Sequence, residues 1–395
     1  MTEPRKIFIL YARFGEGHLQ AASALRQSFV QQGEAEVKLI DLLAESHPVI
    51  NEVSRFVYNK SYNVLPQVYG WVYETTKSMK PDSLFSSWLH SFGALTLRRL
   101  IERERPDAIV HTFPMLVLPL VARKLRKKIP MFNVVTDFDL HRRWVHPDVS
   151  KYYVATEDIR QQLCELGVEP HRVAASGIPI RPGFFRESIQ SLSSAGSLGE
   201  FQKPNVLVMP CVNSAPTEIA AICRNLTRRC NALVTVVCGR NQMMQRYFSD
   251  TLRGVPGVTV LGYVEQIGEL MANSSCIVTK PGGLTLSEAL ASELPIFLYR
   301  PVPGQERNNA IYLESKGAAV VCSSVQQLLG AVSELLQSPN RREEMLRAIQ
   351  ALRKKDASDA IALDISRQLN IMEEATSSTA MPTIRYWDES SRIRT

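Results

Sequence analysis

The chain contains 395 residues, 45% of them hydrophobic and 22% charged, which is the composition of an ordinary soluble globular protein. This length exceeds what one hydrophobic core comfortably supports, so we expect two domains. The formal net charge of +7 and the pI of about 9.0 favour an anionic partner, whether a nucleotide, a nucleic acid or an acidic lipid, without deciding among them.

Apolar runs and cysteines exclude further classes of protein. No apolar stretch approaches the ~20 residues that span a bilayer, and the longest candidate, 113–122, contains two prolines. The apolar run 7–12 is too short for a signal peptide because Arg13 interrupts it. The seven cysteines form no C-x-x-C pair, which fits a reducing cytoplasm. Any membrane role should therefore be peripheral.

The first part of the chain, 1–185, alternates strand-like and helix-like segments. The first strand, 6–11, runs into a turn at 15–17, and a helix is expected over 18–32 because apolar residues recur at helical spacing. Gly33 stands where a C-cap belongs. Such alternation predicts an α/β domain with one parallel sheet. Its further strands are expected at 37–41, 107–111, 131–136, 152–155 and 173–176.

A second alternating series follows a Ser- and Gly-rich segment, 186–204, which we interpret as the interdomain linker. The second domain is expected over 205–370, with its last helices able to cross back to the first domain, and 371–395 is expected to be a mobile tail. Parallel sheets bind ligands at the carboxyl ends of their strands, so the cleft between the domains is the predicted site. Strands are expected near 205–210, 233–238, 258–261, 276–279, 295–298 and 318–322.

The segment 280–289, Lys-Pro-Gly-Gly-Leu-Thr-Leu-Ser-Glu-Ala, follows one of these strands and opens a helix. Two glycines allow a ligand to approach the backbone, and the free N–H groups of a helix start attract phosphate. Glu288 lies about one turn into the helix, where a carboxylate could hold ribose hydroxyls. The alternative is an ordinary strand-to-helix turn, in which Glu288 only stabilises the helix start.

The loop after strand 295–298 carries the polar residues Gln305, Glu306 and Asn309. Amides and carboxylates at a strand end can pair with several sugar hydroxyls. Taken alone, the loop could equally be a solvated connection.

His18 begins the first helix directly after the turn at 15–17. The positive end of a helix lowers the pKa of an imidazole, which keeps it neutral near pH 7 and able to accept a proton. His18 is therefore a candidate general base, although a lone histidine at a helix start is commonly structural.

Asp137-Phe138-Asp139 has the form of a D-x-D metal motif, but no carboxylate or histidine of metal-ligand spacing accompanies it. We interpret these aspartates as turn or cap residues. The neighbouring loop 141–146, with two histidines and a tryptophan, is interpreted as a packed, partly exposed loop rather than a zinc site.

Aromatic residues and lysines are interspersed over 56–92, a mixture suited to an interfacial surface. A basic cluster at 123–128 could face anionic headgroups. Core packing and a solvated helix face are the alternatives. The candidate membrane-contact residues in these segments are Tyr69, Trp71, Tyr73, Trp88, Lys124, Arg126 and Lys127.

Taken together, these segments resemble the family of monogalactosyldiacylglycerol synthases and processive diacylglycerol glucosyltransferases, relatives of the lipid II N-acetylglucosaminyltransferase. The resemblance spans 7–322 in the right order. The segments that carry it are 14–22 (FGEGHLQAA), 135–147 (VTDFDLHRRWVHP), 176–184 (SGIPIRPGF), 238–241 (CGRN) and 280–289 (KPGGLTLSEA).

The resemblance implies a GT-B fold: two Rossmann-like, doubly wound domains facing a cleft, with inverting transfer and no required metal or other cofactor. It implies that His18 is the base and that Gly15 and Gly17 form the acceptor-side turn. It also raises the interfacial interpretation of 56–92, because the family's membrane-facing surface lies in the first domain. The implied donor-binding residues are Lys280, Gly282, Gly283, Leu284, Thr285, Glu288, Gln305, Glu306, Asn309 and Arg240.

We therefore expect an enzyme that moves glucose or galactose from a UDP-sugar to diacylglycerol or a glycosyl-diacylglycerol. It should act as a peripheral protein on the anionic, cytoplasmic face of the cell membrane, without nucleic acid as a partner. The alternatives are a UDP-N-acetylglucosamine 2-epimerase-like isomerase and a non-catalytic UDP-sugar sensor. The sequence leaves open which hexose is used, how many sugars are added and the oligomeric state.

One departure from the family concerns the first strand of the second domain. Relatives usually carry a glycine-rich turn after it, whereas 208–216 reads VMPCVNSAP. Close backbone approach to a diphosphate or sugar is then lost at this point, although Asn213 and Ser214 could donate from their side chains.

Overall fold

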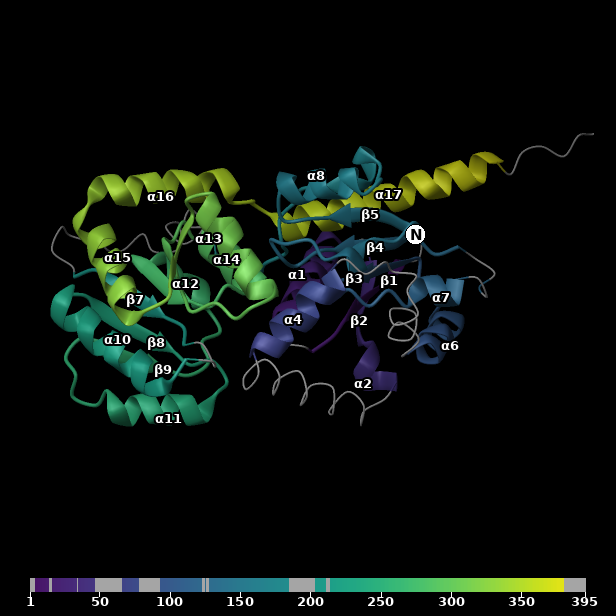
Figure 1. The fold of residues 1–395 in the computed structure, drawn as a ribbon. Coiled ribbons are helices and arrows are strands. Elements are labelled where there is room, and N and C mark those ends of the chain that lie inside the picture. Colours follow the sequence, from purple (N-terminus) through teal and green to yellow (C-terminus); the bar gives the residue numbers. More distant parts are fainter. Residues whose placement is uncertain are drawn as a thin grey trace, which may run out of the picture.

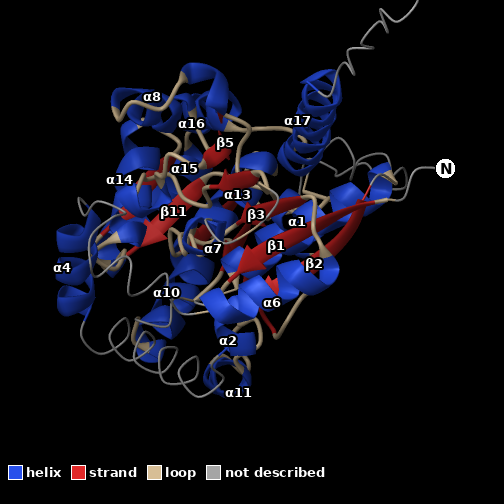
Figure 2. Ribbon diagram, turned by 90° about the vertical axis from the view of Figure 1, so that its right-hand side faces the viewer, coloured by secondary structure: helices blue, strands red, loops and turns tan. Residues whose placement is uncertain are grey.

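The computed structural model describes residues 4–13, 16–33, 35–46, 66–77, 93–122, 125, 128–184, 203–210 and 214–379. It contains two six-stranded parallel sheets, one in each half of the chain. Figure 2 shows helices packed around the strands of both sheets. The predicted α/β class with two doubly wound domains is confirmed.

The first sheet has the strand order β2-β1-β3-β4-β5-β6. Its strands are buried apolar runs, as expected where helices cover both faces of a sheet. They are β1 (Arg5–Tyr11), β2 (Ala35–Asp41), β3 (Ala108–His111), β4 (Met131–Val134), β5 (Val149–Tyr153) and β6 (Val173–Ala174).

Helix α1 (Gly17–Gln32) connects β1 to β2 and positions His18. It buries Ala21, Leu25 and Phe29 on one face, and it ends at Gly33, whose φ of 70° is the left-handed conformation that a C-cap requires. The other helices here are α2 (Leu42–Ser46), α4 (Pro66–Lys77), α6 (Ala94–Glu104), α7 (Leu118–Ala122) and α8 (Glu157–Glu165), after α1 (Gly17–Gln32), with the 3-10 turns η1 (Arg142–Trp144) and η2 (Pro170–Arg172).

The second sheet has the order β12-β11-β10-β7-β8-β9. Its strands are β7 (Asn205–Val208), β8 (Leu233–Val237), β9 (Val258–Leu261), β10 (Cys276–Thr279), β11 (Ile296–Tyr299) and β12 (Ala319–Cys322). Its helices are α10 (Pro216–Arg229), α11 (Gln242–Thr251), α12 (Ile267–Ala272), α13 (Gly283–Ala291), α14 (Gln305–Ser315), α15 (Val325–Gln337) and α16 (Pro339–Leu352).

The last helix, α17 (Ala357–Thr379), returns to the first domain. Figure 1 shows α16 over the second domain and α17 continuing along the first. Ile361, Ile365 and Leu369 join the core that contains Phe29 of α1, and Asp364 accepts a hydrogen bond from Tyr153 at 2.7 Å. Residues 371–379 were expected in a mobile tail, but they form the end of α17. Residues 380–395 lie outside the described residues.

The observed strands follow the predicted ones closely. The largest difference is β5, expected at 152–155 and found at Val149–Tyr153, because its pairing with β4 already begins at Val149, opposite Met131. Most of the linker, 186–202, lies outside the described residues. Within the described part, no helix is long and apolar enough to cross a membrane, and the described cysteines are free thiols.

Candidate active site between the two domains

His18 lies in the first turn of α1, after the carboxyl end of β1. Its Nδ1 is 2.7 Å from the carbonyl oxygen of Thr112 and 3.1 Å from Oγ1 of Thr136. A carbonyl oxygen can only accept, so Nδ1 carries the proton and Nε2 keeps its lone pair. Phe113 packs against the ring edge to face, with centroids 5.0 Å apart. The imidazole is thus held in the tautomer that a general base needs.

The pKa of His18 is lowered to about 4, chiefly by burial, while the Thr112 hydrogen bond opposes the shift. The expected direction of the shift is confirmed, and desolvation by the surrounding protein is its principal cause. The imidazole is neutral at pH 7, and the residue keeps part of its surface exposed.

The turn 280–283 leads from β10 into α13, which begins at Gly283. No side chain caps this helix start. Within the described part of the chain, the backbone N–H groups of residues 283–285 have no hydrogen-bond acceptor. A Cβ at Gly282 would meet nothing within 4 Å, so the space beside this glycine is open. The helix start therefore offers free donors and room for an anion.

The beginnings of α1 and α13 meet across the two domains. A Cβ at Gly17 would lie 3.9 Å from Cβ of Leu284. A Cβ at Gly283 would lie only 2.1 Å from the carbonyl oxygen of Thr136, so glycine is required for this approach. The tertiary structure brings His18 and the α13 turn together, although they stand far apart in the sequence.

Charged groups of the second domain near the start of α13 are paired or buried. Nζ of Lys280 lies 2.7 Å from Oε1 of Glu306, which is buried. Glu288 is buried on α13, and burial raises its pKa to about 7, while the charge of Arg181 opposes the shift. Arg181 belongs to the segment 176–184, just before the linker, and its role was not anticipated from the sequence.

The amides of α14 reach the first domain. Asn309 is completely buried; its Oδ1 accepts from the backbone N–H of Phe138 at 2.9 Å, and its Nδ2 donates to the carbonyl oxygen of Pro281 at 3.1 Å. Nε2 of Gln305 donates to Oδ1 of Asp137. Both amides thus bridge the domains, and their donor-binding roles stay predictions.

Asp137 and Asp139 do not act as the local caps expected from the sequence, because their side chains bond to other elements. Asp137 accepts from α14, and Asp139 accepts from Lys77 at 2.7 Å and from Asn308 at 2.9 Å. In the described part of the chain, no group of three or more histidine, cysteine, aspartate or glutamate side chains is placed to hold a metal ion.

The loop after Asp139 is packed, as predicted. Trp144 is buried, and the ring of His141 lies edge to face against Tyr73. Burial also lowers the pKa of His141 to about 3.

Arg240 follows β8, and its guanidinium lies 4.0 Å from the ring centroid of Tyr263. This cation–π contact makes a flat, exposed surface at the carboxyl edge of the second sheet. Ser214, after β7, is buried.

Helix α4 carries the described part of the candidate membrane surface. Trp71 is 69% exposed, with Val68 and Val72 also exposed on the same face. Tyr73 points the other way and donates to Asp139 at 3.2 Å. The side chain of Tyr69 is not described, and Gly15, Trp88, Lys124, Arg126 and Lys127 lie outside the described residues.

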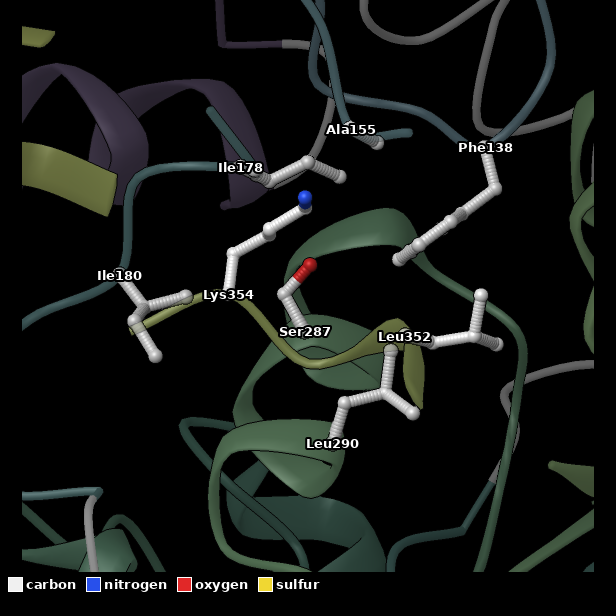
Figure 3. A pocket seen from close by; sticks show the side chains of 9 residues that line it. Phe138, Ala155, Ile178, Ile180, Ser287, Leu290, Leu352 and Lys354 are labelled. Carbon is white, nitrogen blue, oxygen red and sulfur yellow. The ribbon is translucent and has the colours of Figure 1, made fainter. Parts of the chain in front are cut away.

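A small cavity lies where residues 177–180 and 352–354 meet α13 (Figure 3). Ile178, Ile180 and Lys354 line it together with Ser287 of α13, and its volume is about 20 Å³. That is room for about one water molecule, far below the roughly 300 Å³ or more of a ligand pocket. The described domains are therefore closed against each other here.

Comparisons with known proteins agree with this architecture. Residues 18–180 match the family described as monogalactosyldiacylglycerol (MGDG) synthase, and residues 206–361 match the glycosyltransferase family 28 C-terminal domain. The processive diacylglycerol beta-glucosyltransferase of Bacillus licheniformis is 36% identical, over 94% of this chain and 97% of that protein. That of Bacillus subtilis is also 36% identical, over the same shares.

Solved structures share the fold at low sequence identity. Acinetobacter baumannii MurG is 13% identical, with a TM-score of 0.59 over 92% of this chain and 100% of that one. The UDP-GlcNAc 2-epimerase of Neisseria meningitidis is 14% identical, with a TM-score of 0.58 over the same shares. The fold therefore occurs in transferases and epimerases alike and does not by itself decide between them.

Proposed function

Because the chain belongs to the family of monogalactosyldiacylglycerol synthases and processive diacylglycerol glucosyltransferases, we propose that it moves a hexose from a UDP-hexose to diacylglycerol or a glycosyl-diacylglycerol. It is a hexosyltransferase of glycolipid synthesis, and the sequence relatives give no support to an epimerase. The observation that carries a mechanism is the meeting of α1 and α13, which sets a neutral imidazole beside an uncapped helix start.

In this mechanism the diphosphate lies over the free amides of residues 283–285. The helix dipole and these N–H groups stabilise the negative charge that develops on the departing UDP. Lys280 adds positive charge, reduced by its pairing with Glu306. No metal is needed for this stabilisation, so transfer should continue in EDTA.

His18 acts as the general base. Nδ1 donates to Thr112, so Nε2 is free to take the proton of the acceptor hydroxyl as that oxygen attacks the anomeric carbon. Attack from the face opposite the diphosphate inverts the anomeric configuration. The turn at Gly17 lies on the acceptor side of this arrangement, beside Leu284.

The remaining donor contacts come from the second domain. Glu288 would hold the ribose hydroxyls, and Gln305 and Glu306 would contact the hexose, while Asn309 holds the loop between them through its bonds to Phe138 and Pro281. Arg240 would contact the nucleotide from the end of β8. The burial of Glu288 and Glu306 supports roles in a desolvated site, where hydrogen bonds discriminate most strongly.

The acceptor would be reached at a membrane surface. The exposed apolar face of α4 supports peripheral binding, because such a face gains free energy by entering the headgroup region. The basic composition of the chain suits the anionic cytoplasmic leaflet.

The test is to incubate the protein with vesicles of diacylglycerol and anionic lipid and a panel of labelled UDP-sugars, and to identify the glycolipids by mass. We expect a hexosyl-diacylglycerol, formed equally well in EDTA. A parallel reaction without vesicles should leave the UDP-sugar unchanged. Isomerisation of the sugar nucleotide there, or tight binding without any glycolipid, would overturn the proposal.

A further inference from the structure

Asp137 is a buried carboxylate at the point where the two domains touch. It follows β4 and comes from the first domain, yet Gln305 and Asn309 of the second domain both turn towards its Oδ1. The same oxygen lies 3.1 Å from where a Cβ of Gly283 would be. Asp137 is thus next to the α13 helix start as well as to the first turns of α14.

A carboxylate oxygen can only accept, which decides how the two amides are turned. Gln305 must present Nε2 to Asp137, so its Oε1 faces away from Asp137 as a free acceptor. Asn309 is fixed from three sides, by Phe138, Pro281 and Asp137, the last at 3.4 Å. Gln305 is therefore the amide that keeps an atom for a ligand, and Asp137 determines which atom it is.

We propose that Asp137 is a positioning residue for the donor sugar: on domain closure it orients Gln305 so that Oε1 accepts a hydrogen bond from a hydroxyl of the hexose. This inference rests on the proposed function in one respect, namely that a UDP-hexose binds against α13 and α14. It assigns the recognition of the hexose, as distinct from the nucleotide, to a contact that exists only when the domains meet.

The titration of Asp137 supports this role. Burial raises its pKa to about 6, while the hydrogen bonds from Gln305 and Asn309 lower it. Below that pH the carboxyl gains a proton, and the charge-assisted hydrogen bond that it accepts from Gln305 becomes a weaker, neutral one. The charged and titratable groups around it are Asp139 on the same segment, Glu306 on α14, Lys280 before α13, Lys77 on α4 and His18 on α1.

The experiment compares the affinities for UDP-glucose, UDP-galactose and UDP by calorimetry, in wild type and in Asp137→Ala. Since UDP lacks the hexose, its affinity should stay within about twofold, whereas the preferred UDP-hexose should bind roughly tenfold more weakly, the effect of losing one oriented hydrogen bond. Asp137→Asn keeps Oδ1 as a neutral acceptor and should restore part of the loss. In wild type, the ratio of the affinity for the preferred UDP-hexose to the affinity for UDP should fall as the pH drops through about 6.

Asp139→Ala is the matched control, because it removes a carboxylate that also bonds across the domains, to Asn308, without touching Gln305. Its UDP-hexose to UDP affinity ratio should equal that of wild type. In a double-mutant cycle, adding Gln305→Ala to Asp137→Ala should lower the affinity for the UDP-hexose only slightly further.

The inference would be overturned if Asp137→Ala left the UDP-hexose to UDP affinity ratio unchanged, whether both affinities fell equally or neither fell. Asp137 would then be a purely structural contact. Failure of the proposed function would look different, because wild type would then not bind any UDP-hexose or would give no glycolipid.

Discussion

Replacing Gly283 with alanine tests whether catalysis requires the two domains to meet at the start of α13. The added Cβ would lie 2.1 Å from the carbonyl oxygen of Thr136. An unstrained contact between such atoms needs roughly 3.5 Å. The oxygen belongs to the backbone and no side-chain rotation can relieve the overlap, so the domains must separate by about 1 Å or more.

A displacement of this size moves His18 away from the donor, and we expect kcat/KM to fall roughly 10²-fold. The affinity for UDP should change little, because the amides that bind it belong to the second domain alone. Kinetics with diacylglycerol vesicles and calorimetry with UDP measure the two quantities. Gly330→Ala on α15 is the control, since its Cβ would meet nothing within 4 Å. A Gly283→Ala enzyme with wild-type kcat/KM would refute the reasoning.

Three further predictions concern the base, a buried carboxyl and the membrane face. His18→Ala should lower kcat by about 10²- to 10⁴-fold with UDP affinity retained, and an undiminished rate would exclude His18 as the base. Because burial raises the pKa of Glu288 to about 7, ionising this carboxyl destabilises the fold as the pH rises. The melting temperature of Glu288→Gln should therefore be higher than that of wild type at about pH 8 and equal to it at about pH 4. A difference in melting temperature that does not depend on pH would contradict the raised pKa. Trp71→Ser should weaken binding to anionic diacylglycerol vesicles about tenfold, measured by co-sedimentation, while the affinity for UDP stays unchanged. Unaltered vesicle binding would show that α4 is not part of the membrane-binding surface.

The fold followed from local patterns because parallel strands buried on both faces are continuous apolar runs. The segment 276–279 is an example: it was predicted from its sequence and forms β10 within the same bounds. Strand boundaries differed from the prediction where pairing decides them, as for β5, whose first residues pair with β4 although Ser150 and Lys151 interrupt the apolar pattern. The position of α17 also depended on tertiary packing, because Ile361, Ile365 and Leu369 are buried in a core of the first domain that includes Phe29 of α1.

The candidate site was only partly visible in the sequence. His18 and the turn at 280–283 carry local signals, a histidine or glycines beside a helix start. Thr112, Thr136 and Asp137 carry no local signal for their distant partners, because a threonine carbonyl has no sequence signature and the D-x-D form of 137–139 says nothing about a bond to another domain. Asp137 was interpreted as a turn residue for this reason, although it reaches α14 in the other domain.

The amino-acid sequence alone determined the two α/β domains, the uncapped glycine turn and the family to which the chain belongs, because each of these depends on residues that are near neighbours or occur in a fixed order. Only the tertiary structure decided which groups face one another: that burial lowers the pKa of His18, and that Asp137 meets Gln305. Both facts depend on how closely the two domains approach, which no single segment specifies.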